Sequence, residues 1–306
     1  NENFYDLFLN FLSNNELLYL NSKIDWEKID VSLENKLKEN VFINKELFIT
    51  DDFDEFYSIN NLDYPKLEKL VTFDRFTNNY EDLNIEKLDN LKELYINLPR
   101  NFRINITKLP NNLKILQIKN LRNFKLYINI EENVLPENLE ELYWSRKIDF
   151  KLPRKLKKLH IFAVDNFILE KDYLPNDLNE LKIFRYFNNI LDKSNLPSNL
   201  THLTLGDSFN QNIDNLPSNL THLTLGHSFN QNIDNLPINL THLTLGLSFN
   251  KNIDNLPNSL KYLSIKSTYR DFEFNMDINK LPNSITHLTL GKNFNQSINK
   301  FFFHSN

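Results

Sequence analysis

The chain has 306 residues, of which 41% are hydrophobic and 13% aromatic; this is ample for a buried core and excludes a disordered chain. It has no cysteine, which excludes disulfides, thiolate zinc sites and cysteine nucleophiles, and we expect a reducing, cytoplasmic location. The net charge is -5 without long runs of either sign, and no stretch approaches the ~20 apolar residues of a membrane span, so we expect neither nucleic acid nor membrane as a partner.

Residues 1–60 differ from the rest of the chain. Five apolar residues lie at the spacing of one helical face and predict a first helix, and leucines around position 18 predict a second. Residues 27–60 are expected to be short helix or irregular chain. Because the first coil of a solenoid must cover an open hydrophobic end, this segment is expected to form a helical cap. The first apolar face consists of Phe4, Leu7, Phe8, Phe11 and Leu12.

A second interpretation of this segment remains open beside the cap. Leu12, Leu17, Leu20 and Trp26 resemble the core of an F-box, a small helical module that docks onto the Skp1 subunit of ubiquitin ligases. The resemblance implies that these four residues would contact Skp1, and that the rest of the chain would recruit a substrate.

Residues 61–300 repeat with a period of about twenty residues, and residues 301–306 form a tail. The pattern LxxLxL recurs eleven times, which is the signature of a solenoid in which stacked neighbours share one core. The first apolar residue of each copy, which we call the anchor, is Leu67, Leu91, Leu113, Leu139, Leu156, Leu178, Leu200, Leu220, Leu240, Leu260 or Ile285.

Each unit is predicted to consist of a turn, a short strand and a return loop. A Leu-Pro pair begins four residues before most anchors, and proline suits a turn that delivers the chain into a strand. In the strand HLTL, Leu203 and Leu205 alternate with His202 and Thr204, which predicts one buried and one exposed face. Gly206 and its counterparts follow the strand and are expected to permit a sharp bend.

An asparagine recurs ten residues after most anchors. In stacked coils, an asparagine at a fixed place can hydrogen-bond the backbone of the neighbouring coil, so we predict an asparagine ladder. Its members are Asn101, Asn123, Asn166, Asn188, Asn210, Asn230, Asn250 and Asn295.

The repeated LPxxLxxLxLGxxFNQxI resembles the FNIP repeat, a branch of the leucine-rich-repeat architecture; the match is closest at residues 209–213, 229–233, 249–253 and 294–298. The resemblance implies an α/β repeat solenoid of leucine-rich-repeat type. Short parallel strands would line its concave face, joined by mostly irregular return loops, behind a small N-terminal helical cap. Such concave faces usually bind proteins.

We therefore expect a scaffold that binds a protein partner, without enzymatic activity or a cofactor. The outward strand positions vary in the first six units and are nearly identical in the later ones, and varied columns can encode recognition. The first six units are therefore expected to hold the partner. The predicted contact residues are Glu93, Tyr95, Gln117, Glu141, Tyr143, Lys158, His160, Glu180 and Lys182.

One alternative function rests on histidines. His202, His222 and His242 occupy the same outward strand position in consecutive units and should stack within roughly 5 Å of one another. Three imidazoles so placed could bind zinc and leave a position for water, which would suit a metal-dependent hydrolase. Against this, the same column holds unrelated residues in other units, and no carboxylate recurs at a fixed place behind the histidines.

Overall fold

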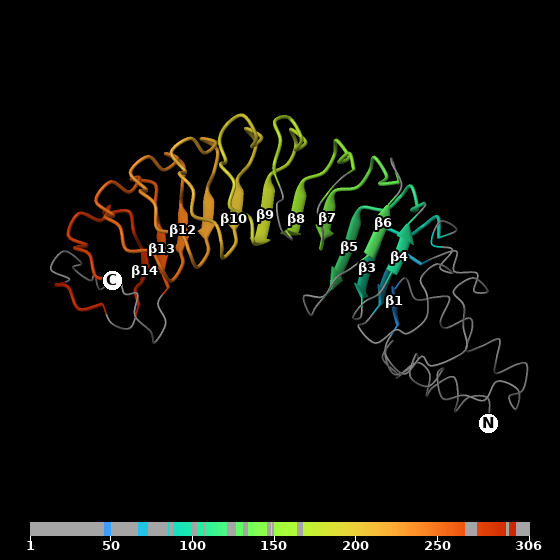
Figure 1. Ribbon diagram of the computed structural model, residues 1–306, viewed down its shortest axis with the longest axis horizontal. Coiled ribbons are helices and arrows are strands. Elements are labelled where there is room, and N and C mark those ends of the chain that lie inside the picture. Colours follow the sequence, from blue (N-terminus) through green and yellow to red (C-terminus); the bar gives the residue numbers. More distant parts are fainter. Residues whose placement is uncertain are drawn as a thin grey trace, which may run out of the picture. The chain divides into compact units, whose positions relative to one another are not determined.

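The computed structural model describes the backbone of residues 46–49, 67–72, 85, 88–98, 103–106, 108–120, 127–130, 134–145, 148, 150–163, 168–266, 274–291 and 294–297. The chain divides into two compact units, Asn1–Tyr143 and Trp144–Asn306. Each unit is a stack of short parallel strands that continue one another in chain order (Figure 1).

The first unit contains a parallel sheet in the order β1, β2, β3, β5, β7. Its strands pair in a register that places equivalent residues of successive repeats side by side, for example Lys69 opposite Glu93 and Glu93 opposite Ile115. The strands are β1 (Glu46–Ile49), β2 (Lys69–Thr72), β3 (Glu93–Leu98), β5 (Ile115–Asn120) and β7 (Glu141–Trp144), the last of which ends at the unit boundary.

The second unit continues with seven parallel strands in chain order, from β8 to β14. His202, His222 and His242 lie opposite one another in the register. The strands are β8 (Lys158–Ala163), β9 (Glu180–Arg185), β10 (His202–Leu205), β11 (His222–Leu225), β12 (His242–Leu245), β13 (Tyr262–Ile265) and β14 (His287–Thr289).

The predicted repeat is confirmed at every anchor, because a strand begins two residues after each of the eleven. Ten of the anchors are buried, and Ile285 is half-buried. The Leu-Pro turn is confirmed as well: in the unit of Leu200, the Pro197 carbonyl accepts the Leu200 N–H at 3.1 Å, which closes a four-residue turn. The burial of β11 alternates between half-buried and buried, as the HLTL pattern predicts.

One part of the prediction was wrong. Residues 27–60 were expected to be helical or irregular, but Glu46–Ile49 forms β1 and pairs in parallel with β2. Among the described residues the return loops are mostly irregular, as expected, although two of them contain β4 (Arg103–Ile106) and β6 (Tyr127–Ile130), which form a separate parallel pair. Both strands carry the sequence x-Ile-Asn-Ile, whose alternating β-branched residues favour extended backbone.

The asparagine ladder is confirmed where its members are described. The Oδ1 atom of Asn188 accepts the N–H of Asn210 at 2.8 Å, Asn210 accepts Asn230 at 2.9 Å, and Asn230 accepts Asn250 at 3.0 Å. The sequence had not indicated Asn275, which accepts the N–H of Asn295 at 3.1 Å. The predicted members Asn101, Asn123 and Asn166 lie outside the described residues.

A column of phenylalanines fills the return side of the core. Its members are Phe187, Phe209, Phe229, Phe249, Phe274 and Phe294, and neighbouring ring centroids are 6.1 to 6.2 Å apart. On the strand face of the same coils, neighbouring rings from His202 to His287 are only 4.0 to 4.2 Å apart. Since backbones in a sheet are about 4.8 Å apart, the coils converge at the strand face and diverge at the phenylalanines. The second unit is therefore curved, with its strands on the concave side (Figure 1).

The glycines after the strands have a steric role in this curvature. A Cβ atom on Gly206 would lie 2.5 Å from the backbone nitrogen of Arg185 in the preceding coil. Gly226 and Gly246 would meet the backbone of the preceding glycine even more closely. Only glycine permits this approach of backbones at the ends of converging strands.

Candidate protein-binding surface

The strand face of the first unit carries the predicted contact residues Glu93, Tyr95, Gln117, Glu141 and Tyr143, all half-buried. Each tyrosine is fixed by the glutamate two residues before it: the Tyr95 hydroxyl donates to Glu93 at 3.2 Å, and the Tyr143 hydroxyl donates to Glu141 at 2.8 Å. A two-residue separation places both members of a pair on one face of a strand.

Lysines complete this part of the surface. The Lys69 ammonium lies 5.9 Å from the centroid of the Tyr95 ring, and the Lys119 ammonium lies 5.2 Å from the Tyr143 ring. Both distances are within the range of cation–π attraction. Burial lowers the pKa of Lys119. These residues were not predicted, although Lys119 lies two positions beyond Gln117 in the strand pattern and could have been included on that ground.

In the second unit, the structure brings together His160, Glu180 and Lys182, which we call the β8–β9 cluster. His160 Nε2 lies 2.8 Å from Glu180 Oε1, and the Lys182 ammonium lies 2.6 Å from the same oxygen. The side chains of His160 and Glu180 are only 12% and 18% exposed. Lys158, the fourth predicted residue of this unit, lies opposite Glu180 in the register.

Lys182 and His160 stabilise the ionised form of Glu180. Burial by itself raises the pKa of Glu180, but the hydrogen bonds and charges of Lys182 and His160 outweigh burial and lower the pKa to about 2. The carboxylate is therefore ionised at every ordinary pH.

Next to the β8–β9 cluster lies a pair of aromatic rings that the sequence analysis did not single out. Phe162 and Phe184 stack with centroids 4.8 Å apart and planes at 21°, and both are half-buried. They follow His160 and Lys182 by two residues on each strand, so the period-two pattern could have identified them. Charged and aromatic groups thus adjoin on one face.

Beyond the cluster, the strand face becomes a column of stacked rings, which we call the ring column: His202, His222, His242, Tyr262 and His287. The stacking predicted for the first three is confirmed, with centroids 4.1 and 4.0 Å apart and planes within 14°. Tyr262 and His287 extend the same column. Beside it runs a parallel row of hydroxyl groups from Thr204, Thr224, Thr244, Ser264 and Thr289.

The protons of the histidines can be placed from their neighbours. The Thr221 hydroxyl donates to the Thr201 carbonyl at 3.0 Å and also lies 2.9 Å from Nδ1 of His222. A carbonyl can only accept and the hydroxyl has a single proton, so Nδ1 of His222 must donate to the hydroxyl. The same arrangement recurs at His202, His242 and His287. In the neutral form of each of these imidazoles, Nε2 is therefore the nitrogen without a proton.

The zinc alternative does not fit this arrangement. The rings lie face to face, so the Nε2 lone pairs of His202, His222 and His242 run side by side and do not converge on one point, as tetrahedral coordination requires. Among the described residues, no group of three or more histidine, cysteine or acidic side chains could hold a metal ion.

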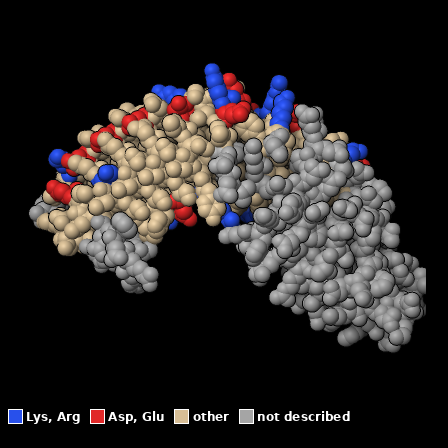
Figure 2. All heavy atoms as spheres, in the orientation of Figure 1, with Lys and Arg blue, Asp and Glu red and all other residues tan. Residues whose placement is uncertain are grey.

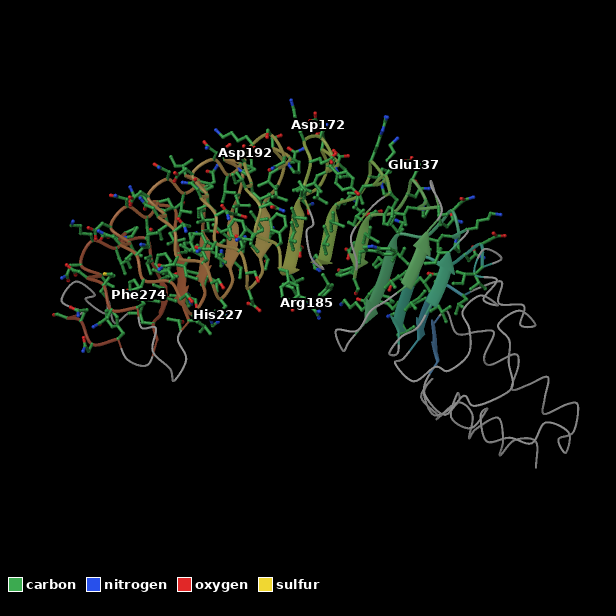
Figure 3. All side chains as sticks on the ribbon, viewed as in Figure 1. Glu137, Asp172, Arg185, Asp192, His227 and Phe274 are labelled. Carbon is green, nitrogen blue, oxygen red and sulfur yellow. The ribbon has the colours of Figure 1, made fainter. Side chains whose placement is uncertain are left out.

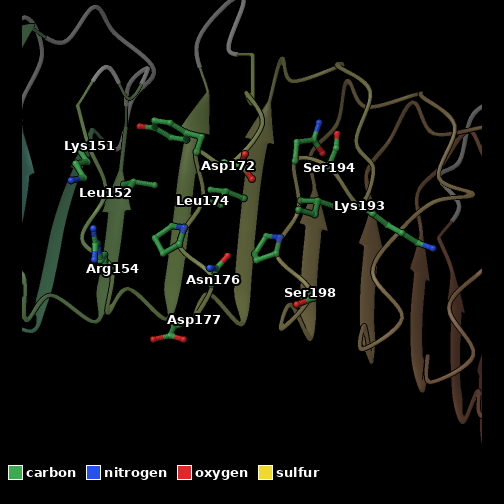
Figure 4. A pocket seen from close by; sticks show the side chains of 15 residues that line it. Lys151, Leu152, Arg154, Asp172, Leu174, Asn176, Asp177, Lys193, Ser194 and Ser198 are labelled. Atoms are coloured by element: carbon green, nitrogen blue, oxygen red, sulfur yellow. The ribbon is translucent and has the colours of Figure 1, made fainter.

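The opposite side of the second unit is less suited to recognition. The charged side chains visible in Figure 2 gather along the outer rim, with both signs intermixed, and Figure 3 shows Asp172 and Asp192 on that rim. A shallow hollow of about 880 Å³ lies at the Leu-Pro turns of three coils (Figure 4). Its lining combines basic residues, Lys151, Arg154 and Lys193, with the acidic Asp172 and Asp177, so it does not present charge of one sign.

The remaining predicted residues cannot be placed. Leu12, Leu17, Leu20 and Trp26, the residues of the F-box resemblance, lie outside the described residues, as does the tail at residues 301–306. Within the part of the chain that the structure describes, no helix is long and apolar enough to span a bilayer.

The fold and its strand face define a parallel-strand solenoid of leucine-rich-repeat type. FNIP repeats account for part of it: the FNIP Repeat model matches residues 187–228, 209–235, 229–267 and 274–303. No curated protein matches the chain significantly.

Two solved structures are similar to this chain. One is described as CroV588, a novel circular leucine-rich-repeat protein; it has a TM-score of 0.61 and 32% sequence identity, and the match covers 82% of this chain and 40% of that one. This chain therefore spans less than half the length of that protein. The other is a leucine-rich repeat protein from Bacteroides ovatus, with 16% identity over 80% of this chain and 60% of that one; its TM-score of 0.19 is too low to indicate a shared fold.

Proposed function

We propose that the chain is a non-enzymatic scaffold that binds a protein partner on its strand face, with the β8–β9 cluster as an anchor. The FNIP and leucine-rich-repeat architecture supports this proposal, because solenoids of this kind present extended concave surfaces that bind other proteins.

The observation that carries the proposal is the composition of the face at β8 and β9. Glu180, which is 18% exposed, is fixed by Lys182 and His160, and the stacked rings of Phe162 and Phe184 lie beside it. Half-buried aromatic rings next to positioned charges are typical of the residues that contribute most to protein interfaces. The outer rim has exposed, intermixed charges instead, which contribute little.

Affinity purification of the full chain tests the proposal. We expect the partner recovered with the wild type to be depleted by His160→Ala combined with Lys182→Ala. The matched control is Lys171→Ala combined with Lys193→Ala, which removes two exposed charges from the outer rim. The control should retain the partner; equal recovery with all three proteins would reject the β8–β9 anchor.

A finer form of the proposal makes the chain the substrate-recruiting adaptor of a Skp1-type ubiquitin ligase. Its support lies in the sequence alone, in the F-box resemblance of Leu12, Leu17, Leu20 and Trp26. In this form the full chain binds purified Skp1 at micromolar concentration, and Leu17→Ala with Leu20→Ala abolishes the binding. Absence of binding by the wild type would reduce the proposal to a scaffold.

A further inference from the structure

We propose that the ring column of β10 to β14 is an acid-responsive contact surface for an acidic peptide segment of the partner. This inference rests on the proposed protein-binding function. In their neutral forms, His222 and His242 present uncharged rings to the ligand. On acidification these two histidines take up protons in the presence of the peptide carboxylates, and binding strengthens.

The geometry makes the column a single responsive unit. Successive rings are 4.0 to 4.2 Å apart along five strands, and the Nδ1 atoms of the four histidines are occupied by threonine hydroxyls. Protonation can therefore occur only at Nε2, which the threonine leaves unprotonated. His202, Tyr262 and His287 are exposed, so a ligand can reach this edge of the column.

The fixed charges that face the column nearly balance. On β9, the column is faced by Glu180, which lies opposite His202, and by Lys182. Lys261, the residue before β13, repels the protonated form of His242. Glu180 is already paired with Lys182 and His160. Beyond the strand ends lie Asp207 and His227, both exposed. The two carboxylates, Glu180 and Asp207, balance the two ammonium groups, Lys182 and Lys261, so protonated histidines would give this face a net positive charge that favours an anionic ligand.

Neighbouring rings resist protonation in the free protein. Burial, followed by the charges of His202 and His242, lowers the pKa of His222 to about 4, and burial and nearby positive groups lower the pKa of His242 as well. Two imidazolium rings 4 Å apart repel each other strongly. Carboxylates placed along the edge of the column would offset this repulsion, so proton uptake and binding of an acidic peptide must favour each other.

The test is a binding measurement with the full chain and a fluorescent peptide of alternating aspartate and glycine, at pH 7.5 and pH 5.0 and constant ionic strength. Aspartate, with a pKa of about 3.9, stays largely ionised at both values. We expect the affinity to rise roughly tenfold on acidification, which over this pH interval corresponds to an average uptake of about 0.4 proton on binding. A peptide of asparagine and glycine should show no such gain.

Variants separate the ring column from the rest of the face. The triple variant His202→Gln, His222→Gln and His242→Gln should lose the gain; the readout is the ratio of its affinities at pH 5.0 and pH 7.5, which should fall to about one whatever its affinity at pH 7.5. The single variant His222→Phe, which keeps a stacked ring, should lose part of the gain. Nuclear magnetic resonance titration of the wild type should show the pKa of His222 rising when the aspartate peptide is present.

The outcomes distinguish this inference from the proposed function. Equal affinity of the wild type at the two pH values, no binding at pH 5.0, or a full gain in the triple variant would overturn the inference. If the gain occurs but His160→Ala with Lys182→Ala has no effect at pH 7.5, the inference stands and the β8–β9 anchor fails. If those substitutions weaken binding while acidification adds nothing, the anchor stands and the inference fails.

Discussion

Replacement of Asn210 by alanine is the sharpest test of how the coils are held together. Asn210 Oδ1 accepts two donors from the next coil, the Asn230 N–H at 2.9 Å and Gln231 Nε2 at 3.0 Å. Alanine removes the acceptor and leaves a half-buried backbone N–H without its partner. Such a group costs about 1–3 kcal/mol. Because Asn230 is only half-buried, we expect the free energy of unfolding to fall by about 1–2 kcal/mol.

The assay is urea unfolding followed by far-ultraviolet circular dichroism, with two comparison variants. Asn212→Ala removes an exposed asparagine whose hydrogen bonds go only to Asp214 in the same loop, and should cost less than about 0.5 kcal/mol. Asn210→Asp keeps an acceptor oxygen and should recover part of the loss. If Asn210→Ala matched Asn212→Ala, the asparagine ladder would not contribute to stability in the way its geometry indicates.

Three further predictions concern the curvature, the ring column and the β8–β9 cluster. Gly226→Ala would place a Cβ atom against the Gly206 backbone, so thermal unfolding should show a loss of about 1–3 kcal/mol. Because the pKa of His222 is lowered from 6.5 to about 4, the unfolded chain binds more protons between these values, and stability falls as the pH drops through this window. The pKa shift limits this loss of stability to about 3 kcal/mol, which solvent screening reduces to about 1–2 kcal/mol. In His222→Phe, the urea midpoint should therefore fall less between pH 7.5 and pH 5.0 than it does in the wild type. Glu180→Gln should lower the free energy of unfolding by about 1–2 kcal/mol at pH 7, measured by urea unfolding. The control Glu140→Gln, at the ion pair with the exposed Lys114, should lower it by less than about 0.5 kcal/mol. Since the pKa of Glu180 is lowered to about 2, the stability that this carboxylate contributes is present above pH 4.5 and is lost toward pH 2.

The architecture could be predicted because the repeat encodes the same contacts in every unit. A buried anchor such as Leu200, the turn closed by Pro197, and the alternation of Leu203 with Thr204 each leave a local trace in the sequence. The asparagine ladder was predictable for the same reason, since its phase is fixed. Asn275 escaped detection because its unit contains an insertion between the anchor Leu260 and this asparagine, which breaks the period.

Other contacts were not predicted. Asn219 and Asn239, one residue before their anchors, donate to the Ser198 and Ser218 carbonyls at 2.9 Å and form a second asparagine ladder, which its fixed phase could have indicated. The pairing of β4 with β6 depends on how two return segments of different length meet. Such contacts follow from the stacking of coils and not from any single unit.

The candidate surface was predicted only as a set of outward positions. The pattern placed His160, Glu180 and Lys182 on one face, but not the shared contact at Glu180 Oε1, which depends on side-chain rotamers. The histidine column was predicted to stack, and the distances confirm it. The orientation of the histidine nitrogens, which argues against a zinc site, could be established only from the hydroxyl of the threonine that precedes each histidine.

Site-specific photo-cross-linking tests the central claim, that the strand face holds the partner, most directly. A photoreactive phenylalanine analogue is introduced in the full chain at Lys182 or Thr224 on the strand face, and at Ile190 or Ile238, two residues that are 67% and 76% exposed. With the co-purified partner, cross-links should form from positions 182 and 224 and not from 190 and 238. Cross-links confined to 190 and 238 would contradict a binding role for the strand face.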